Sequence, residues 1–237
     1  MTTFTEHCRE QSGLWDVFSQ NGEDGLIQII LDMIKPQTMT CMEFGAADGF
    51  FCSNTAYLWN KCGWQATLVE SGDDLFSKLE RVTRGNSKVD AFHDSVANPD
   101  VFCPDVLDLI SIDVDGEDFT IWERSDVRHR VVVIEHNPTF PPHVEMHAGQ
   151  WIGSSAASLV RLGELKEYKF LMATKTNCFF VRNEDAEVFD RFDCSLRNNF
   201  DSSSLNYVVT DYHGNFDVAG SLPYGMNWKV EFGMHYE

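Results

Sequence analysis

The chain has 237 residues, 43% of them hydrophobic, which is enough for one domain with a sizeable core. Its 37 acidic and 18 basic residues give a formal net charge of -19. Such a charge repels phosphate backbones and anionic lipid over a Debye length, so nucleic acid and membrane surfaces are excluded as general partners.

Cysteine usage and hydropathy predict where the protein works. The seven cysteines are odd in number and form no C-x-x-C pair, which indicates a reduced chain. No apolar run approaches the ~20 residues of a membrane span, and the first residues, MTTFTEHCRE, are too polar for a signal peptide. We therefore expect a soluble cytoplasmic protein.

The N-terminal segment, residues 1–36, is predicted to be helical. Ser19 or Asn21 is expected to cap a helix that carries Glu23 and Asp24 in its first turn and ends at Pro36. The polar stretch SQNGEDG is longer than a cap requires. Two interpretations therefore stay open: simple capping, or a loop that lies over a ligand.

The stretch from Thr38 to Glu70 reads as strand, glycine turn, helix and second strand. A short apolar run stops at Gly45, and Gly49 closes a loop of small residues that lets backbone approach a ligand. Ser53 can cap the helix that follows. Glu70 lies 21 residues after Gly49, the spacing at which an acid binds ribose hydroxyls in nucleoside-binding sheets.

Further strands and helices alternate after Glu70. Apolar and β-branched runs predict strands at 89–92, 106–112, 131–135, 169–173 and 178–181, with a helix begun by Ser154 or Ser155 before the last two. The last two strands are separated by Thr174 to Asn177 alone, which is too short for a helical crossover, so they should be antiparallel.

This alternation predicts a single α/β domain. We expect a Rossmann-like, doubly wound, mostly parallel sheet between two helical layers, with the ligand crevice at the carboxyl ends of the strands. The core sheet would span residues 38–183. Residues 193–237 show no clean period and are predicted to form a loop-rich extension, a cap or an oligomer contact, which leaves a homo-oligomer open.

The stretches EFGAADG, LVES, SIDVDGEDF and VVVIEHNP follow one another in an order that resembles class I S-adenosylmethionine-dependent methyltransferases, in particular the FkbM-like group. Together with SQNGEDG they cover roughly residues 19–182. The resemblance implies a seven-stranded sheet with a C-terminal antiparallel hairpin, and the pattern above agrees. One departure is Ala47, which replaces the middle glycine of G-x-G-x-G and constrains the backbone more.

The resemblance also implies the cofactor and its residues. Gly45, Ala46 and Gly49 would approach the methionine and ribose parts of S-adenosylmethionine, with Asp113 beside them. Glu43 would lie near the ammonium group and Glu70 at the ribose hydroxyls, while Asp94 and Ser95 would flank the adenine.

A second group of polar residues follows two neighbouring strands. Asp113 and Asp115 end one strand, Glu135 and His136 end the next, and the four converge if the strands are adjacent. One interpretation is a metal site for Mg²⁺ or Mn²⁺, held by all four residues. Another has no metal: Asp113 orients His136, which acts as general base. A structural alternative is that Asp115 forms a turn and Asp118 caps the next helix.

A weaker metal candidate is the group His143, Glu145 and His147, whose spacing fits no regular element well.

From these observations we expect an O-methyltransferase acting on a hydroxyl of a small molecule, a sugar or a glycosylated metabolite. The alternative is a non-catalytic S-adenosylmethionine-binding protein that serves as a sensor or a structural component. A dinucleotide-dependent oxidoreductase is disfavoured because the turn lacks G-x-G-x-x-G.

Overall fold

The computed structural model describes residues 1–102, 105–149 and 152–220. Its strands are β1 Thr40–Phe44, β2 Gln65–Glu70, β3 Val89–His93, β4 Leu109–Ile112, β5 Val131–Glu135, β6 His147–Ala148, β7 Gly153–Ser154, β8 Tyr168–Ala173, β9 Asn177–Arg182, β10 Asn206–Thr210 and β11 Phe216–Gly220. Its α-helices are α1 Phe4–Glu10, α2 Glu23–Ile34, α3 Ala56–Lys61, α4 Asp73–Thr83, α5 Asp118–Arg124 and α6 Ala156–Leu165. Short 3-10 turns lie at Pro99–Val101, Asn183–Asp185, Glu187–Phe189, Leu196–Asn198 and Ser202–Ser204.

The main sheet has seven strands in the order β3-β2-β1-β4-β5-β9-β8. Strands β1 to β5 pair in parallel, and β9 is antiparallel to both of its neighbours, β5 and β8. The predicted doubly wound, mostly parallel sheet with an antiparallel hairpin is confirmed. The hairpin inserts β9 next to β5, so its turn lies beside the end of β5.

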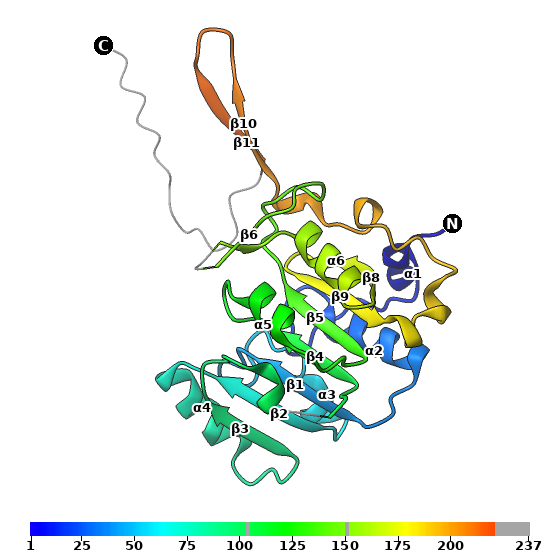
Figure 1. The fold of residues 1–237 in the computed structure, drawn as a ribbon, viewed down its shortest axis with the longest axis vertical. Coiled ribbons are helices and arrows are strands. Elements are labelled where there is room, and N and C mark those ends of the chain that lie inside the picture. Colours follow the sequence, from blue (N-terminus) through cyan, green and yellow to red (C-terminus); the bar gives the residue numbers. More distant parts are fainter. Residues whose placement is uncertain (103–104, 150–151, 221–237) are drawn as a thin grey trace.

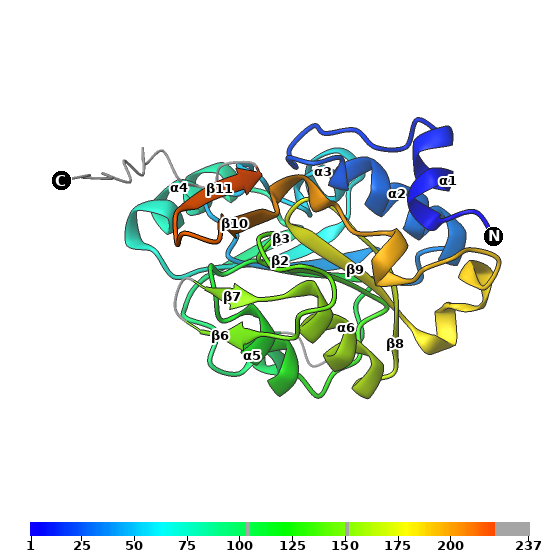
Figure 2. The same cartoon turned by 90° about the horizontal axis from the view of Figure 1, so that it is seen from above.

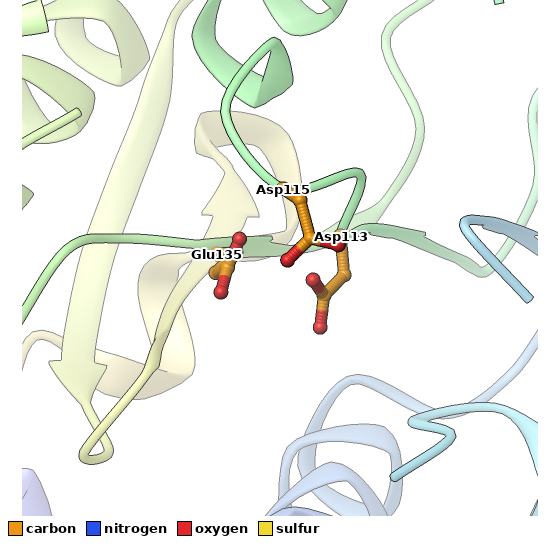
Figure 3. Close-up of side chains that lie close together, drawn as sticks. All are labelled: Asp113, Asp115 and Glu135. Carbon is orange, nitrogen blue, oxygen red and sulfur yellow. The ribbon is translucent and has the colours of Figure 1, made fainter. Parts of the chain in front are cut away.

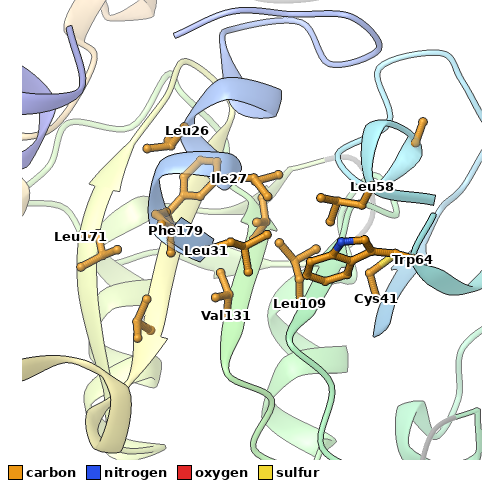
Figure 4. Close-up of a cluster of buried hydrophobic side chains, with 14 of the residues drawn as sticks. Leu26, Ile27, Leu31, Cys41, Leu58, Trp64, Leu109, Val131, Leu171 and Phe179 are labelled. Carbon is orange, nitrogen blue, oxygen red and sulfur yellow. The ribbon is translucent and has the colours of Figure 1, made fainter. Parts of the chain in front are cut away.

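Helices cover both faces of this sheet. Figure 2 shows α1 to α4 on one side and α5 and α6 on the other, with the sheet between them. Two clusters of buried apolar side chains fill the layers, one under each set of helices. In the first, Leu26, Ile27 and Leu31 of α2 pack on Leu109 and Val131 of the sheet (Figure 4). Strands buried on both faces explain the nearly continuous apolar runs of β4 and β5.

The fourth strand begins later than its apolar run suggests. The sequence predicts a strand from Val106, whereas β4 begins at Leu109. Directly before β4, the carboxylate of Asp108 is fully buried and accepts N–H groups from Gln37, Thr38 and Met39. Its carboxylate also pairs with Arg130 at 2.7 Å. This buried ion pair lies at the end of the sheet opposite to the carboxyl ends of the strands.

The start of α2 corrects the predicted helix cap. The N-cap residue is Gly22, in a left-handed conformation at φ 90°, rather than Ser19 or Asn21. Ser19 still caps the helix from a distance, because its hydroxyl accepts the N–H of Asp24 at 2.9 Å. The helix α1, which follows an N-cap at Thr3, lies in the predicted N-terminal helical segment, although its own bounds were not predicted.

The described part of the C-terminal extension contains an element that the sequence pattern did not predict. After short turns, β10 and β11 form an antiparallel hairpin that projects from the body of the molecule (Figure 1). Residues 221–237 of the predicted extension lie outside the described residues. Within the described ranges, the helices are all too short or too polar to cross a membrane.

Candidate functional site

A cavity of about 630 Å³ opens at the carboxyl ends of β1 to β5. This is the crevice in which open α/β sheets bind their ligands, and its volume suits a small molecule. Seven carboxyl side chains line it: Glu43, Glu70, Asp94, Asp113, Asp115, Glu117 and Glu135. Among the described residues of the wall, none is Lys, Arg or His. The cavity therefore favours a ligand that carries positive charge.

The loop after β1 closes one side of the cavity with a strained backbone. Ala47 has φ 47° and Cys52 has φ 55°, and Gly45 and Gly49 also have positive φ. Gly45 must be glycine, because a Cβ there would lie 1.6 Å from the carbonyl oxygen of Asp113. Left-handed conformations cost a non-glycine residue free energy, so such strain is typical of functional loops.

Two carboxylates at the ends of β1 and β2 hold this loop. Glu70 accepts the N–H of Ala47 at 2.8 Å with one oxygen and that of Gly72 at 2.6 Å with the other. Glu43 is buried and accepts the hydroxyls of Ser53 and Thr55 and the N–H of Asn54. Burial raises the pKa of Glu43, and these three donors oppose that rise. Both side chains nevertheless line the cavity.

Most of the residues predicted to contact the cofactor line the cavity. These are Glu43, Gly45, Glu70, Asp94, Ser95 and Asp113. Ala46 and Gly49 do not belong to the described wall, and their contact with the cofactor stays a prediction. Ala46 is buried under the loop and donates its N–H to Val69 at 3.0 Å. Gly49 packs against the helical layer, where an added Cβ would meet Leu79 at 2.9 Å.

The predicted carboxylate cluster forms from Asp113, Asp115 and Glu135. One carboxylate oxygen of each lies within 4.8 Å of the others, and Figure 3 shows the side chains converging from two neighbouring strand ends. Asp118 builds the turn that makes this possible. Its two oxygens accept the N–H groups of Val114 and Gly116, which leaves Asp115 in a left-handed conformation at φ 57°. Asp118 is thus a turn residue, as the structural alternative foresaw in part.

The cluster carries more negative charge than its surroundings can stabilise. Burial, and then the neighbouring carboxylates, raise the pKa of both Asp113 and Glu135, which are hydrogen-bonded to each other. Burial also raises the pKa of Asp118 to about 6, against the effect of its N–H donors. Either a shared proton or a cation must therefore offset the repulsion at neutral pH.

His136 does not join this cluster, which corrects its predicted roles as metal ligand and general base. Its imidazole is buried, its Nε2 lies 3.3 Å from the Thr174 carbonyl oxygen, and its ring lies beside Phe200. Burial lowers its pKa to about 4, so the ring is neutral. The physical reason is strand alternation: neighbouring residues point to opposite faces, so Glu135 and His136 diverge. The backbone at His136 instead joins the end of β5 to the turn before β9, because its main-chain N–H donates to the carbonyl oxygen of Thr176 at 2.7 Å.

In the weaker metal candidate, Glu145 and His147 contact other side chains. Glu145 pairs with Arg161 at 3.3 Å, and the ring of His147 stacks on Phe119 with centroids 4.1 Å apart. Within the described ranges, His143, Glu145 and His147 do not converge as a ligand group.

Several wall residues were not predicted as site residues. They are Gln20, Ala47, Phe51, Cys52, Ser53, Ser71 and Glu117, together with apolar neighbours. The polar stretch SQNGEDG was the signal for Gln20, and the position directly after the glycine loop was the signal for residues 51–53. Phe51 is 74% exposed at the cavity mouth, whereas Phe50 turns inward and stacks on Phe18.

Comparison with solved structures identifies the fold. An S-adenosylmethionine-dependent methyltransferase from Clostridium acetobutylicum is similar over 76% of this chain and 98% of its own, at 8% identity and a TM-score of 0.50. The N-terminal domain of EvdMO1 with SAH bound matches 76% of this chain and 96% of its own, at 15% identity and a TM-score of 0.48. Fibrillarin from Aeropyrum pernix, with natively bound S-adenosyl-L-methionine, matches 63% and 68%, at 11% identity and a TM-score of 0.47.

No protein-family model matches the chain, and no curated protein matches its sequence. The sheet order and the first of these likenesses establish a Rossmann-like methyltransferase fold. Membership of the FkbM-like group stays a prediction.

Proposed function

We propose that the protein is an S-adenosylmethionine-dependent methyltransferase that methylates a hydroxyl of a small molecule, a sugar or a glycosylated metabolite. The observation that carries the proposal is the acidic cavity at the carboxyl ends of β1 to β5 in a methyltransferase fold. Seven wall carboxylates favour a sulfonium cofactor electrostatically and disfavour anionic acceptors. An uncharged polyol fits this wall better than a phosphorylated metabolite.

The cofactor would lie along the strand ends. Glu70 would bind the ribose hydroxyls, because it ends β2 and its carboxylate borders the cavity. Asp94 and Ser95, beyond the end of β3, would flank the adenine. The amino-acid half would then extend past Gly45 toward the ends of β4 and β5.

The three clustered carboxylates would hold a divalent cation, Mg²⁺ or Mn²⁺. Asp113, Asp115 and Glu135 fit such an ion, since hard cations prefer carboxylate oxygens and the three converge within 4.8 Å. A cation there would supply Lewis acidity toward the acceptor hydroxyl. Without one, Asp113 and Glu135 would share a proton, and the ionised member of the pair would accept the proton of the hydroxyl.

Methyl transfer is an in-line displacement, so the protein mainly orients donor and acceptor. The acceptor oxygen forms a bond to the methyl carbon as the sulfur–carbon bond breaks, and the hydroxyl proton leaves to a base or to solvent. The carboxylate cluster is the part of the wall suited to receive it.

The donor is tested by calorimetric titration of S-adenosylmethionine into wild type and Glu70→Gln, with Glu123→Gln on the surface of α5 as the matched control. We expect binding to wild type and control, and at least tenfold weaker binding to Glu70→Gln. Absence of binding to the wild type contradicts the proposal.

Catalysis and the cation need a second experiment. Methyl transfer to a panel of neutral sugars is assayed before and after chelation, with Asp113→Asn alongside. Loss of activity on chelation and recovery with Mg²⁺ support the cation, whereas full activity in metal-free buffer rejects it. A protein that binds the cofactor tightly but methylates no acceptor would instead be a sensor or a structural component. A cytoplasmic location and a homo-oligomer are further parts of this proposal.

A further inference from the structure

The loop SQNGEDG, residues 19–25, is held to an unusual degree by acidic side chains. Six consecutive backbone N–H groups, 17 to 22, all donate to carboxylates: three to Asp24, two to Glu23 and one to Asp16. Glu23 and Asp24 are buried. Burying two carboxylates is costly, and capping α2 alone needs neither of them, since Ser19 already accepts the Asp24 N–H.

The same loop is hydrogen-bonded to the turn between β8 and β9. The other oxygen of Glu23 accepts the hydroxyl of Thr174 at 2.7 Å, and the Asn21 amide donates to Thr176 at 3.1 Å. Thr174 and Thr176 belong to the turn before β9, which is joined to the end of β5 through Asn177 opposite Glu135. The loop is therefore fixed next to the carboxylate cluster, at the end of the cavity opposite Asp94 and Ser95.

What this fixed loop presents to the cavity is Gln20. It is the only side-chain amide among the described residues of the wall, which offers no Lys, Arg or His. The other hydrogen-bond donors among the described side chains of the wall are hydroxyls: that of Ser53 donates to Glu43, and Ser71 and Ser95 follow β2 and β3 at the other end of the cavity. Next to the carboxylate cluster, a ligand with a carboxylate group would therefore use Gln20 or the backbone as its donor.

The glycine loop is poorly placed to be that donor. The N–H groups of Gly45 and Ala46 donate to Val69, and those of Gly49, Phe50 and Phe51 donate within the loop itself. The N–H of Ala47 donates to Glu70. These backbone donors are used by the protein, so the loop shapes the cavity without offering them to an anion.

We propose that Gln20 donates a hydrogen bond to the α-carboxylate of the cofactor's amino-acid half and so fixes that end of the cofactor beside the carboxylate cluster. This inference rests on the proposed function, which puts the nucleoside half at β2 and β3 and the amino-acid half toward β5. The buried Glu23 and Asp24 are positioning residues that act through the loop backbone. A hydrogen bond to a charged group is stronger than a neutral one, so one amide is enough to contribute measurably.

The test pairs a change in the protein with a change in the ligand. Affinities of wild type, Gln20→Ala and Gln20→Glu are measured by calorimetry for S-adenosylmethionine and for decarboxylated S-adenosylmethionine, which lacks only the carboxylate. We expect Gln20→Ala to lower the affinity for S-adenosylmethionine at least tenfold, about 1.4 kcal/mol, and the affinity for the decarboxylated ligand less than twofold. Gln20→Glu should lower the affinity for S-adenosylmethionine further, because the carboxylate of the new side chain then faces the carboxylate of the ligand.

Gln28→Ala is the matched control, since its amide donates to Asp32 on α2, away from the cavity. It should change neither affinity. Equal weakening of both ligands by Gln20→Ala, or no weakening of either, overturns the role of Gln20. Failure of wild type to bind either ligand refutes the proposed cofactor itself, so the two failures are distinct.

Discussion

Replacing Glu135 by glutamine should stabilise the protein at neutral pH. The wild-type carboxyl keeps its proton in the folded state because burial and Asp113 raise its pKa above neutrality, whereas the unfolded chain ionises near 4.5. An amide has no proton to retain, and it can donate the same hydrogen bond to Asp113. The variant therefore lacks the cost that the wild type carries.

The magnitude follows from linkage. Below pH 4.5 the carboxyl is protonated in both states and contributes no difference. As pH rises, the unfolded state gains about 1.36 kcal/mol per pH unit from ionisation that the folded state forgoes, so wild-type stability falls. At about pH 7.5 the expected gain from Glu135→Gln reaches about 4 kcal/mol as an upper bound.

Urea unfolding with a chelator present, from about pH 4.5 to about pH 8.5, measures this difference. Glu117→Gln is the control, because it makes the same change of side chain at an exposed position of the same wall. A second series with Mg²⁺ should stabilise wild type more than Glu135→Gln, which has lost a ligand. A pH-independent difference, or a variant less stable than wild type at neutral pH, would refute the reasoning.

Three further predictions concern stability. Arg130→Met should lower the free energy of unfolding by about 3 to 5 kcal/mol in urea, because it leaves Asp108 buried without its cation, and adding Asp108→Asn should recover part of the loss. As pH falls from about 6.5 to about 4, the wild type should lose up to about 3 kcal/mol of unfolding free energy, because the buried His136 ring stays neutral while the same ring in the unfolded chain protonates. His136→Asn should not show this loss, and a pH profile equal to that of the wild type would contradict the reasoning. Ala47→Gly should raise the melting temperature by relieving about 1 kcal/mol of left-handed strain, and a fall would count against it.

Local pattern predicted most of the fold. The apolar runs located the seven strands of the main sheet to within a few residues, and the short turn at 174–177 established that the last two strands are antiparallel. These features depend on neighbours in the chain, which sequence periodicity records directly. The contacts of the Asp108 carboxylate with Thr38, Met39 and Arg130 were missed, because they join segments that are distant in the chain.

The candidate site also has residues that the sequence predicted and residues that it did not. The sequence by itself determined which acids end the strands, because in a parallel sheet all strand ends meet at one edge, and so it predicted Glu70, Asp113, Asp115 and Glu135 as cavity residues. It also held the information to exclude His136, since adjacent strand residues face opposite ways.

Only the tertiary structure decided what else lines the cavity. Gln20 precedes the cluster residue Glu135 by more than a hundred positions, and it reaches the wall because buried acids fasten its loop to the turn before β9. Ala46 and Gly49 lie outside the described wall for a related reason. A glycine loop shows which backbone can bend, but the direction of each residue depends on the hydrogen bonds that close the loop. Contacts between distant segments are selected by packing and charge together, and no local pattern contains them.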